Sequence, residues 1–310
     1  MKKTISAIIP CYNAEKFLAE AITSLLTQTY PPLEIIVIDD GSTDRSFQVA
    51  KSFGGPVKVY RQPNQGESIA RNQGIARAQG EFLYFLDADD VVEKTSFEKM
   101  INAIKGPESV VLMGLALFRD DPDNPFEIHY PQFEAFLPDI FQTNFGPPIC
   151  WLFPAKLVKK IGGFREDLRL SEDWEFCARI ALAGGQLVPI NHIGALHRVH
   201  DQSQVRVTPL KQVRLGHVAV KESICREILK DKKFLYKYGD QAFWSGWVSL
   251  IRALNAGASW EEVQALAKLL ENIARYSPGN LENSYLIKLI KLLGIRRACH
   301  LKRIFGFKGD

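Results

Sequence analysis

The chain has 310 residues, of which 46% are hydrophobic and 24% charged, and its net charge is +4. It is long enough to bury a full core, and no run of 18 uninterrupted apolar residues predicts a transmembrane helix. The first residues resemble the positive start of a leader peptide. The apolar run after them ends at Pro10, however, which is too short for a cleavable leader. We therefore expect a cytoplasmic protein.

The cysteines and the basic residues indicate which metal sites and partners to expect. The five cysteines are scattered, odd in number and without a Cys-x-x-Cys pair, which predicts reduced thiols and no zinc knuckle. Residues 281–310 hold seven lysines and arginines against two acidic residues. The basic charge therefore belongs to this tail, and we expect no nucleic-acid partner.

The first hundred residues alternate strand and helix patterns. Strands are predicted at 5–10, 33–38, 57–60 and 82–86, and helices at 13–28, after Asp44, and at 68–78. Asn13 is expected to cap the first of these helices. Short connections between Val/Ile/Leu-rich strands predict a mostly parallel sheet with helices on both faces.

The second half is less regular. A strand is predicted at 110–118, a long loop at 119–138, helices at 154–161 and 172–183, and a last strand at 186–189. A loop of that length is usually functional or mobile. From about Thr208 the pattern is helical. We therefore predict an α/β domain over residues 1–207 and an α-helical C-terminal extension over 208–310.

Acidic residues follow two of the buried strands and begin a later helix. These three acidic segments are Asp39-Asp40, Asp87-Ala88-Asp89-Asp90 and Glu172-Asp173. Parallel strands open onto one carboxyl edge, where α/β proteins bind ligands. Helix capping explains Asp44 and could explain Asp173. The three acidic segments together favour a metal and nucleotide site.

Six motifs occur in a recognisable order and spacing: Ile8 to Asn13, Val37 to Asp44, Ala70-Arg71-Asn72, Gly80 to Asp90, Gly162-Gly163-Phe164 and Glu172-Asp173. In these motifs the chain resembles family 2 glycosyltransferases, which are inverting enzymes with the GT-A fold that use nucleotide-diphosphate sugars. The resemblance covers residues 4 to about 205, and the motifs as a set are specific. The resemblance implies a Rossmann-like GT-A fold, and it leaves the helical extension unexplained.

The resemblance also implies roles at the nucleotide. Pro10 and Tyr12 would line the base pocket, where the Tyr12 ring stacks on uracil or another base. Asp40 would accept the base N–H while Asp39 orients the turn, with Asn13 in support. Asp87 matches the acid near the ribose. Arg71 either faces the base or diphosphate or occupies an exposed helix position.

A further set of roles concerns the metal and the chemistry. Asp89 matches the metal-binding member of a D-x-D motif for Mn²⁺ or Mg²⁺, with Asp90 in support. His200 is expected at the metal or a phosphate, and Arg198 at a phosphate. A zinc site at His192, His197 and His200 is the less favoured alternative. Asp173 matches the general base, with Glu172 beside it.

The expected partners are a nucleotide-diphosphate sugar, most simply a UDP-sugar, and a discrete sugar or lipid-linked acceptor. The Gln-x-x-Arg-Trp motif of processive synthases is absent. Two alternatives stay open. A nucleotidyltransferase would need a Gly-rich basic loop where this chain has Pro10 to Asn13, and a non-catalytic sugar-nucleotide-binding protein would not need Asp89 and Asp173.

The tail from about Ser284 to Phe307 combines apolar residues with interspersed lysines and arginines. Such a segment can lie on an anionic membrane, which would give the protein a peripheral membrane contact near a membrane-borne acceptor. The alternative is that its apolar face packs on the catalytic domain.

Overall fold

The computed structural model describes residues 3–133, 135–200 and 208–276. The chain folds into two compact units. We call the first the sheet unit, which comprises Met1–Phe136, Asn144–Arg169 and Ile180–Val207. We call the second the helical unit, which comprises Leu137–Thr143, Leu170–Arg179 and Thr208–Asp310. The domain boundary predicted between 207 and 208 stays a prediction.

The sheet unit contains one mixed sheet with the strand order β3-β2-β1-β4-β8-β6-β9-β5, and β7 pairs with β6. The strands are β1 Ile5–Cys11, β2 Glu34–Asp39, β3 Val57–Arg61, β4 Phe82–Phe85, β5 Val91–Val92, β6 Ser109–Phe118, β7 Glu127–His129, β8 Trp151–Pro154 and β9 Gln186–Arg198. The first four pair with one another in parallel, as predicted. Antiparallel pairs of β8 with β4 and β6 continue the sheet.

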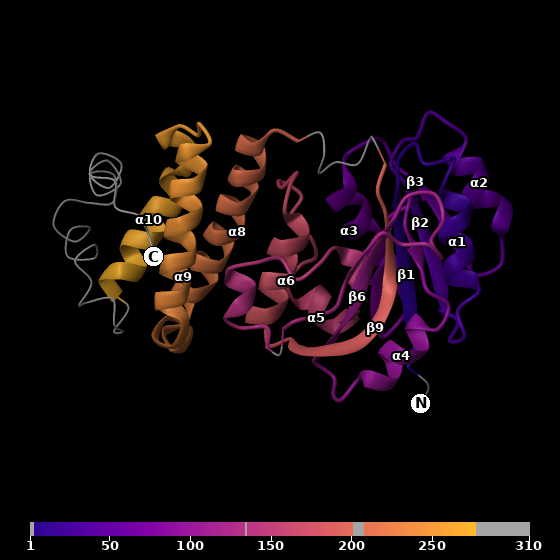
Figure 1. Ribbon diagram of the computed structural model, residues 1–310, viewed down its shortest axis with the longest axis horizontal. Coiled ribbons are helices and arrows are strands. Elements are labelled where there is room, and N and C mark those ends of the chain that lie inside the picture. The colour runs from indigo at the N-terminus through magenta and orange to yellow at the C-terminus, as the bar shows by residue number, and fades with distance from the viewer. Residues whose placement is uncertain (1–2, 134, 201–207, 277–310) are drawn as a thin grey trace. The chain divides into compact units, whose positions relative to one another are not determined.

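Helices cover both faces of the parallel strands, which confirms the predicted α/β class. The helices of the sheet unit are α1 Leu18–Leu26, α2 Ser46–Phe53, α3 Glu67–Arg77, α4 Ser96–Ala103 and α5 Ala155–Lys160. A further helix, α6 Glu172–Leu182, begins in the helical unit. Figure 1 shows α1 and α2 on one side of β1 to β3 and α3 on the other. Helix α3 approaches β1 so closely that a Cβ at Gly74 would lie 2.4 Å from Ile8 Cγ2. Only glycine fits there.

Three local predictions were wrong. Asn13 does not cap a helix, because α1 begins at Leu18 and Asn13 has a positive φ of 50°. The region 119–138, predicted as a loop, contains β7. Strand β9 continues to Arg198, nine residues beyond its predicted end, because it pairs in parallel with β6 along most of its length.

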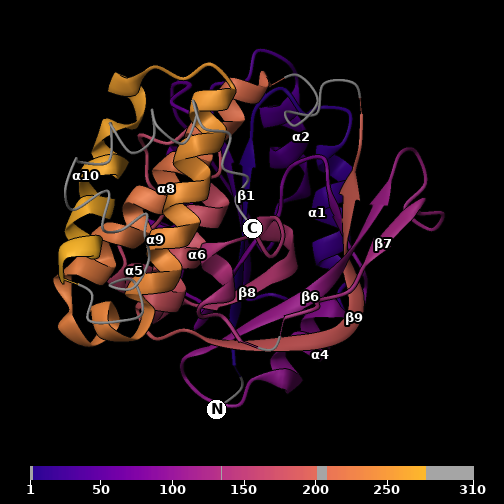
Figure 2. The ribbon, with the colours of Figure 1, turned by 60° about the vertical axis from the view of Figure 1, so that its left-hand side comes forward.

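The helical unit contains α8 Leu210–Lys230, α9 Lys232–Asn255 and α10 Trp260–Tyr276. They run alongside one another, as Figure 2 shows. The unit also holds the start of α6, where Trp174 Nε1 donates to the Ile140 carbonyl over 2.6 Å. Lys221 of α8 is buried, donates to the Phe141 carbonyl and lies 3.9 Å from the centre of the Trp174 ring. Buried polar contacts thus attach α8 to two earlier segments.

Two further predictions concern the membrane and the thiols. Within the described ranges, no helix is long and apolar enough to span a membrane. The four cysteines in these ranges are buried, as expected. The predicted membrane-docking segment, 284–307, lies outside the described residues, so its interpretation stays a prediction.

The buried Lys221 predicts a pH-dependent stability. Burial lowers its pKa to about 7. Between that value and its ordinary value near 10.5, the unfolded chain binds a proton that the folded chain lacks. The free energy of unfolding therefore rises with pH, by at most about 1.4 kcal/mol per pH unit. Lys221→Met should flatten this rise in urea unfolding measured at about pH 7, 8 and 9.

The control for this prediction is Lys230→Met, since Lys230 is exposed at the end of the same helix. The range stops at about pH 9 because burial raises the pKa of Cys225 to about 12. The folded state then holds a proton that the unfolded state loses, which lowers stability at higher pH. Equal slopes for wild type and Lys221→Met would show that Lys221 stays protonated in the fold.

Candidate active site

A pocket of about 400 Å³ lies at the carboxyl edge of the parallel strands, and we call it the edge pocket. It lies there because β1, β2 and β4 end side by side, with Cys11 in register with Asp39. Most of the predicted nucleotide and metal residues line it. These are Pro10, Tyr12, Asn13, Asp40, Asp87, Asp89 and His200.

Asp40 holds the loop that leads into α3. Its Oδ1 accepts hydrogen bonds from Gln62 Nε2 at 2.8 Å and the Gln65 N–H at 2.9 Å. Its Oδ2 accepts one from the Gly66 N–H at 2.8 Å. Gly66 has a φ of 100°, which favours glycine. Asp40 therefore shapes the wall of the pocket as well as lining it.

Asn13 joins the turn after β1 to the turn after β2, and Asp39 joins the end of β2 to the end of β3. Asn13 Oδ1 accepts from the Thr43 N–H at 2.8 Å, and the Asn13 N–H donates to Ser42 Oγ at 3.0 Å. Asp39 is buried and pairs with Arg61 at 3.0 Å. Beside these contacts Tyr12 is 51% exposed at the pocket, where its ring can act as a stacking surface.

Arg71 is buried on α3 and pairs with two acids of the pocket. Its Nη2 lies 2.8 Å from Asp87 Oδ1 and also donates to Glu67. The guanidinium lies over the Phe164 ring at 5.1 Å. Burial alone would raise the pKa of Asp87, but the Arg71 charge holds it below its usual value. The alternative that Arg71 is an exposed helix residue is wrong.

Asp89 and His200 meet at the pocket although 111 residues separate them. His200 Nε2 lies 2.9 Å from Asp89 Oδ2, and both side chains are partly exposed. The His200 ring stacks on Phe17 at 5.5 Å between centroids. A carboxylate and an imidazole are suitable ligands for Mn²⁺, and such cations complete their shell with water and substrate phosphates. The pair therefore fits the expected cation.

The acidic turn contains a second histidine pair. Asp90 is fully buried, its Oδ2 lies 3.0 Å from His197 Nδ1, and its Oδ1 accepts from the Arg198 N–H at 2.8 Å. Burial raises the pKa of Asp90. Burial would lower the pKa of His197, but Asp90 and its neighbours outweigh that effect and raise it. His197 thus neutralises the buried end of the turn.

The structure changes two further expectations, namely the zinc alternative at the three histidines and the phosphate contact at Arg198. His192 contacts Ser96, Lys99 and Glu93 instead of the other histidines. In the described ranges no group of three or more His, Cys, Asp or Glu could hold a metal, so the zinc alternative has no support. Arg198, expected at a phosphate, is 5% exposed, and its guanidinium bonds to protein groups.

Glu172 and Asp173 belong to the helical unit. Both are half-buried at the start of α6, and Asp173 Oδ1 accepts from the Trp174 N–H at 2.7 Å. Ser171 before them has a φ of 60°. Asp44 accepts from the N–H of Ser46, the first residue of α2, at 2.9 Å. The N-cap of this helix is Arg45, however, and it makes no side-chain capping bond, so the prediction that Asp44 caps the helix was wrong.

Sequence reasoning missed part of the pocket. Phe17, Asn64, Gly66 and Glu67 also line it. A glycine after a polar run and directly before a helix is a sign of a functional turn, and Gly66 fits that pattern. Phe17 carried no such sign, because its place depends on where β9 brings His200.

Comparison with known proteins identifies the class of enzyme. Residues 6–162, about half of the chain, match glycosyl transferase family 2. The chain therefore belongs to this family. It is 35% identical over 130 residues to Glycosyltransferase GlyG of Streptococcus pneumoniae, a match covering 41% of this chain and 43% of GlyG. Since the chain spans less than half of GlyG, that likeness carries no substrate. Family membership favours glycosyl transfer over the nucleotidyltransferase alternative.

Solved structures confirm the GT-A fold. S. aureus TarS 1-349 in complex with UDP-GlcNAc superimposes with a TM-score of 0.67 at 21% identity, over 99% of this chain and 94% of TarS. Mannosyltransferase PcManGT from Pyrobaculum calidifontis, in complex with GDP-Man and Mn²⁺, gives 0.51 at 17% identity, over 99% and 89%. At these identities the likeness establishes the fold alone.

The pair of the buried Arg71 with the partly buried Asp87 predicts a loss of stability on substitution. Arg71→Met leaves Asp87 without its cation, and breaking a buried pair from one side costs about 3–5 kcal/mol. Glu67→Gln is the control, because Glu67 is 41% exposed and its pair should contribute about 1 kcal/mol or less. Urea unfolding of both variants measures the difference. An Arg71→Met protein as stable as Glu67→Gln would refute the pairing.

Proposed function

We propose that the protein transfers a single sugar, with inversion, from a UDP-sugar to a discrete hydroxyl acceptor. The observation that carries this proposal is the edge pocket, where an exposed tyrosine ring and several carboxylates meet at the ends of parallel strands. The complex of TarS with UDP-GlcNAc supports the choice of nucleotide by analogy.

Within the proposal, Pro10 and Tyr12 bind the base at one end of the edge pocket. Asp40 accepts the base N–H while keeping its bonds to the 62–66 loop, since a carboxylate has about four acceptor sites and Asp40 uses three. Asp87 accepts from the ribose hydroxyls, with Arg71 keeping it ionised. Asn13 and Asp39 hold the two turns in place.

Asp89 and His200 would hold Mn²⁺ or Mg²⁺ at the other end of the pocket, supported by Asp90. A bound divalent cation would offset the charge that builds on the departing diphosphate. The Mn²⁺ complex of PcManGT supports a cation in this fold. The short contact between Asp89 and His200 means that the two proposed ligands lie side by side before a cation binds.

Asp173 is proposed to take the acceptor proton. As the acceptor oxygen forms its bond to the sugar C1, the bond from C1 to the phosphate oxygen breaks and the nucleoside diphosphate leaves with the electron pair. The proton passes to the Asp173 carboxylate. Glu172 is the alternative base. The acceptor is proposed to be a sugar or a lipid-linked sugar.

The proposed cation site predicts metal-dependent nucleotide binding. UDP titrated by calorimetry should bind wild type about tenfold or more tightly with Mn²⁺ than with EDTA. Asp89→Asn should remove that difference, because the cation loses its carboxylate ligand. Asp120→Asn is the control, since Asp120 is exposed on the segment after β6. Equal affinities with and without Mn²⁺ in wild type would remove the cation from donor binding.

The proposed base predicts a separation of binding from turnover. Asp173→Asn should keep the affinity for UDP but slow UDP release from a panel of UDP-sugars by about 10²-fold or more. Glu172→Gln is the matched control and should turn over like wild type. If Glu172→Gln shows the loss and Asp173→Asn does not, Glu172 is the base. Wild type that releases no UDP from any donor would favour the non-catalytic alternative.

A further inference from the structure

Arg198, the last residue of β9, is a buried cation close to the edge pocket but outside its lining. A buried guanidinium is costly unless all its donors find partners. This arginine therefore has to be explained by the groups that surround it, and three of its nitrogens have identified acceptors.

The guanidinium of Arg198 joins three elements of the sheet unit. Its Nε donates to the Asp89 carbonyl over 2.9 Å, and its Nη1 donates to the Arg119 carbonyl over 3.0 Å. Its Nη2 donates to Glu20 Oε2 on α1. The bond to Asp89 fixes the peptide plane of the D-x-D residue and hence the direction in which its side chain leaves the backbone.

Two aromatic rings keep the guanidinium from turning. It lies 4.9 Å from the centre of the Phe17 ring and 4.4 Å from the centre of the Phe118 ring. Stacking of this kind suits the planar guanidinium and would not hold a lysine ammonium in the same orientation. Phe17 also stacks on His200, so this ring links Arg198 to one proposed metal ligand, while the bond from Nε links it to the other, Asp89.

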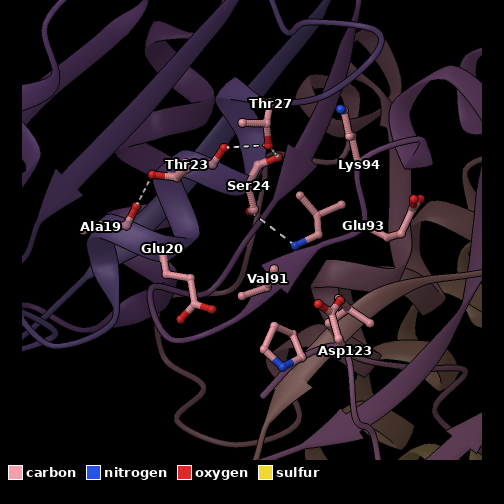
Figure 3. A pocket seen from close by; sticks show the side chains of 12 residues that line it. Ala19, Glu20, Thr23, Ser24, Thr27, Val91, Glu93, Lys94 and Asp123 are labelled. Carbon is pink, nitrogen blue, oxygen red and sulfur yellow. Dashed lines mark hydrogen bonds between the residues drawn. The ribbon is translucent and has the colours of Figure 1, made fainter. Parts of the chain in front are cut away.

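Glu20 can be reached without touching the edge pocket. It lines a separate groove of about 520 Å³, which we call the α1 groove. In Figure 3, Glu20 projects from α1 on the same side as Val91. The α1 groove and the edge pocket share no lining residue. A change at Glu20 can therefore affect Asp89 only through Arg198 or through long-range charge.

We propose that Arg198 and Glu20 form a positioning pair that sets the orientation of Asp89, and with it the metal affinity of the enzyme. This inference rests on the proposed function, because it assumes that Asp89 and His200 hold the cation. Neither residue touches donor or cation. Supporting contacts of this kind commonly change metal affinity by about 10–100-fold.

The test measures Mn²⁺ binding by the loss of the free-ion EPR signal, in the presence of saturating UDP. Glu20→Gln and Arg198→Lys should each raise the Kd for Mn²⁺ by about tenfold or more. Both should leave UDP affinity in EDTA unchanged. Glu15→Gln is the matched control, because Glu15 lies just before α1 and pairs with Arg45 instead.

The outcomes separate the two hypotheses. Wild type that binds no Mn²⁺ with UDP overturns the proposed cation site and this inference together. Wild type that binds Mn²⁺, with Glu20→Gln binding it equally well, overturns the positioning pair alone. An equal loss in Glu20→Gln and Glu15→Gln also overturns it, since any removed charge would then suffice. Should Arg198→Lys fail to fold, the partly exposed Glu20 decides the question.

Discussion

The acidic turn after β4 depends on the cationic groups that surround it. Asp87, Asp89 and Asp90 lie within four residues, and like charges so close together would repel each other. Each has its own partner: Arg71 for Asp87, His200 for Asp89 and His197 for Asp90. These partners offset the repulsion between the three carboxylates of the turn.

The need for these partners explains the path of the later chain. Strand β9 supplies His197 and Arg198 to the turn, with His200 just beyond its end, while α3 supplies Arg71. The parallel strands bring the three aspartates to one edge of the sheet. Strand β9 pairs with β5 just after the acidic turn and so brings the basic side chains next to the aspartates. The edge pocket therefore joins segments more than 100 residues apart in the sequence, and its geometry depends on the whole sheet unit.

The sequence predicted the parts of this arrangement that local patterns encode. Buried Val/Ile/Leu runs revealed β1 to β4, and acids after strands revealed the pocket edge. The length of β9 was missed because its second half has the mixed polar and apolar sequence that is typical of a loop. Pairing with β6 makes this segment a strand. The roles of Arg71 and Arg198 were missed for a related reason. A buried arginine is indistinguishable from an exposed one until its distant partners, Asp87 and Glu20, are known.

The central claim is that Asp89 and His200 hold a divalent cation against the diphosphate of the donor. Anomalous diffraction at the manganese edge, from crystals grown with UDP and Mn²⁺, tests it most directly. The account predicts one peak within coordination distance of the Asp89 carboxylate, His200 Nε2 and the diphosphate oxygens. UDP seated in the edge pocket with no manganese between it and these two side chains would contradict it.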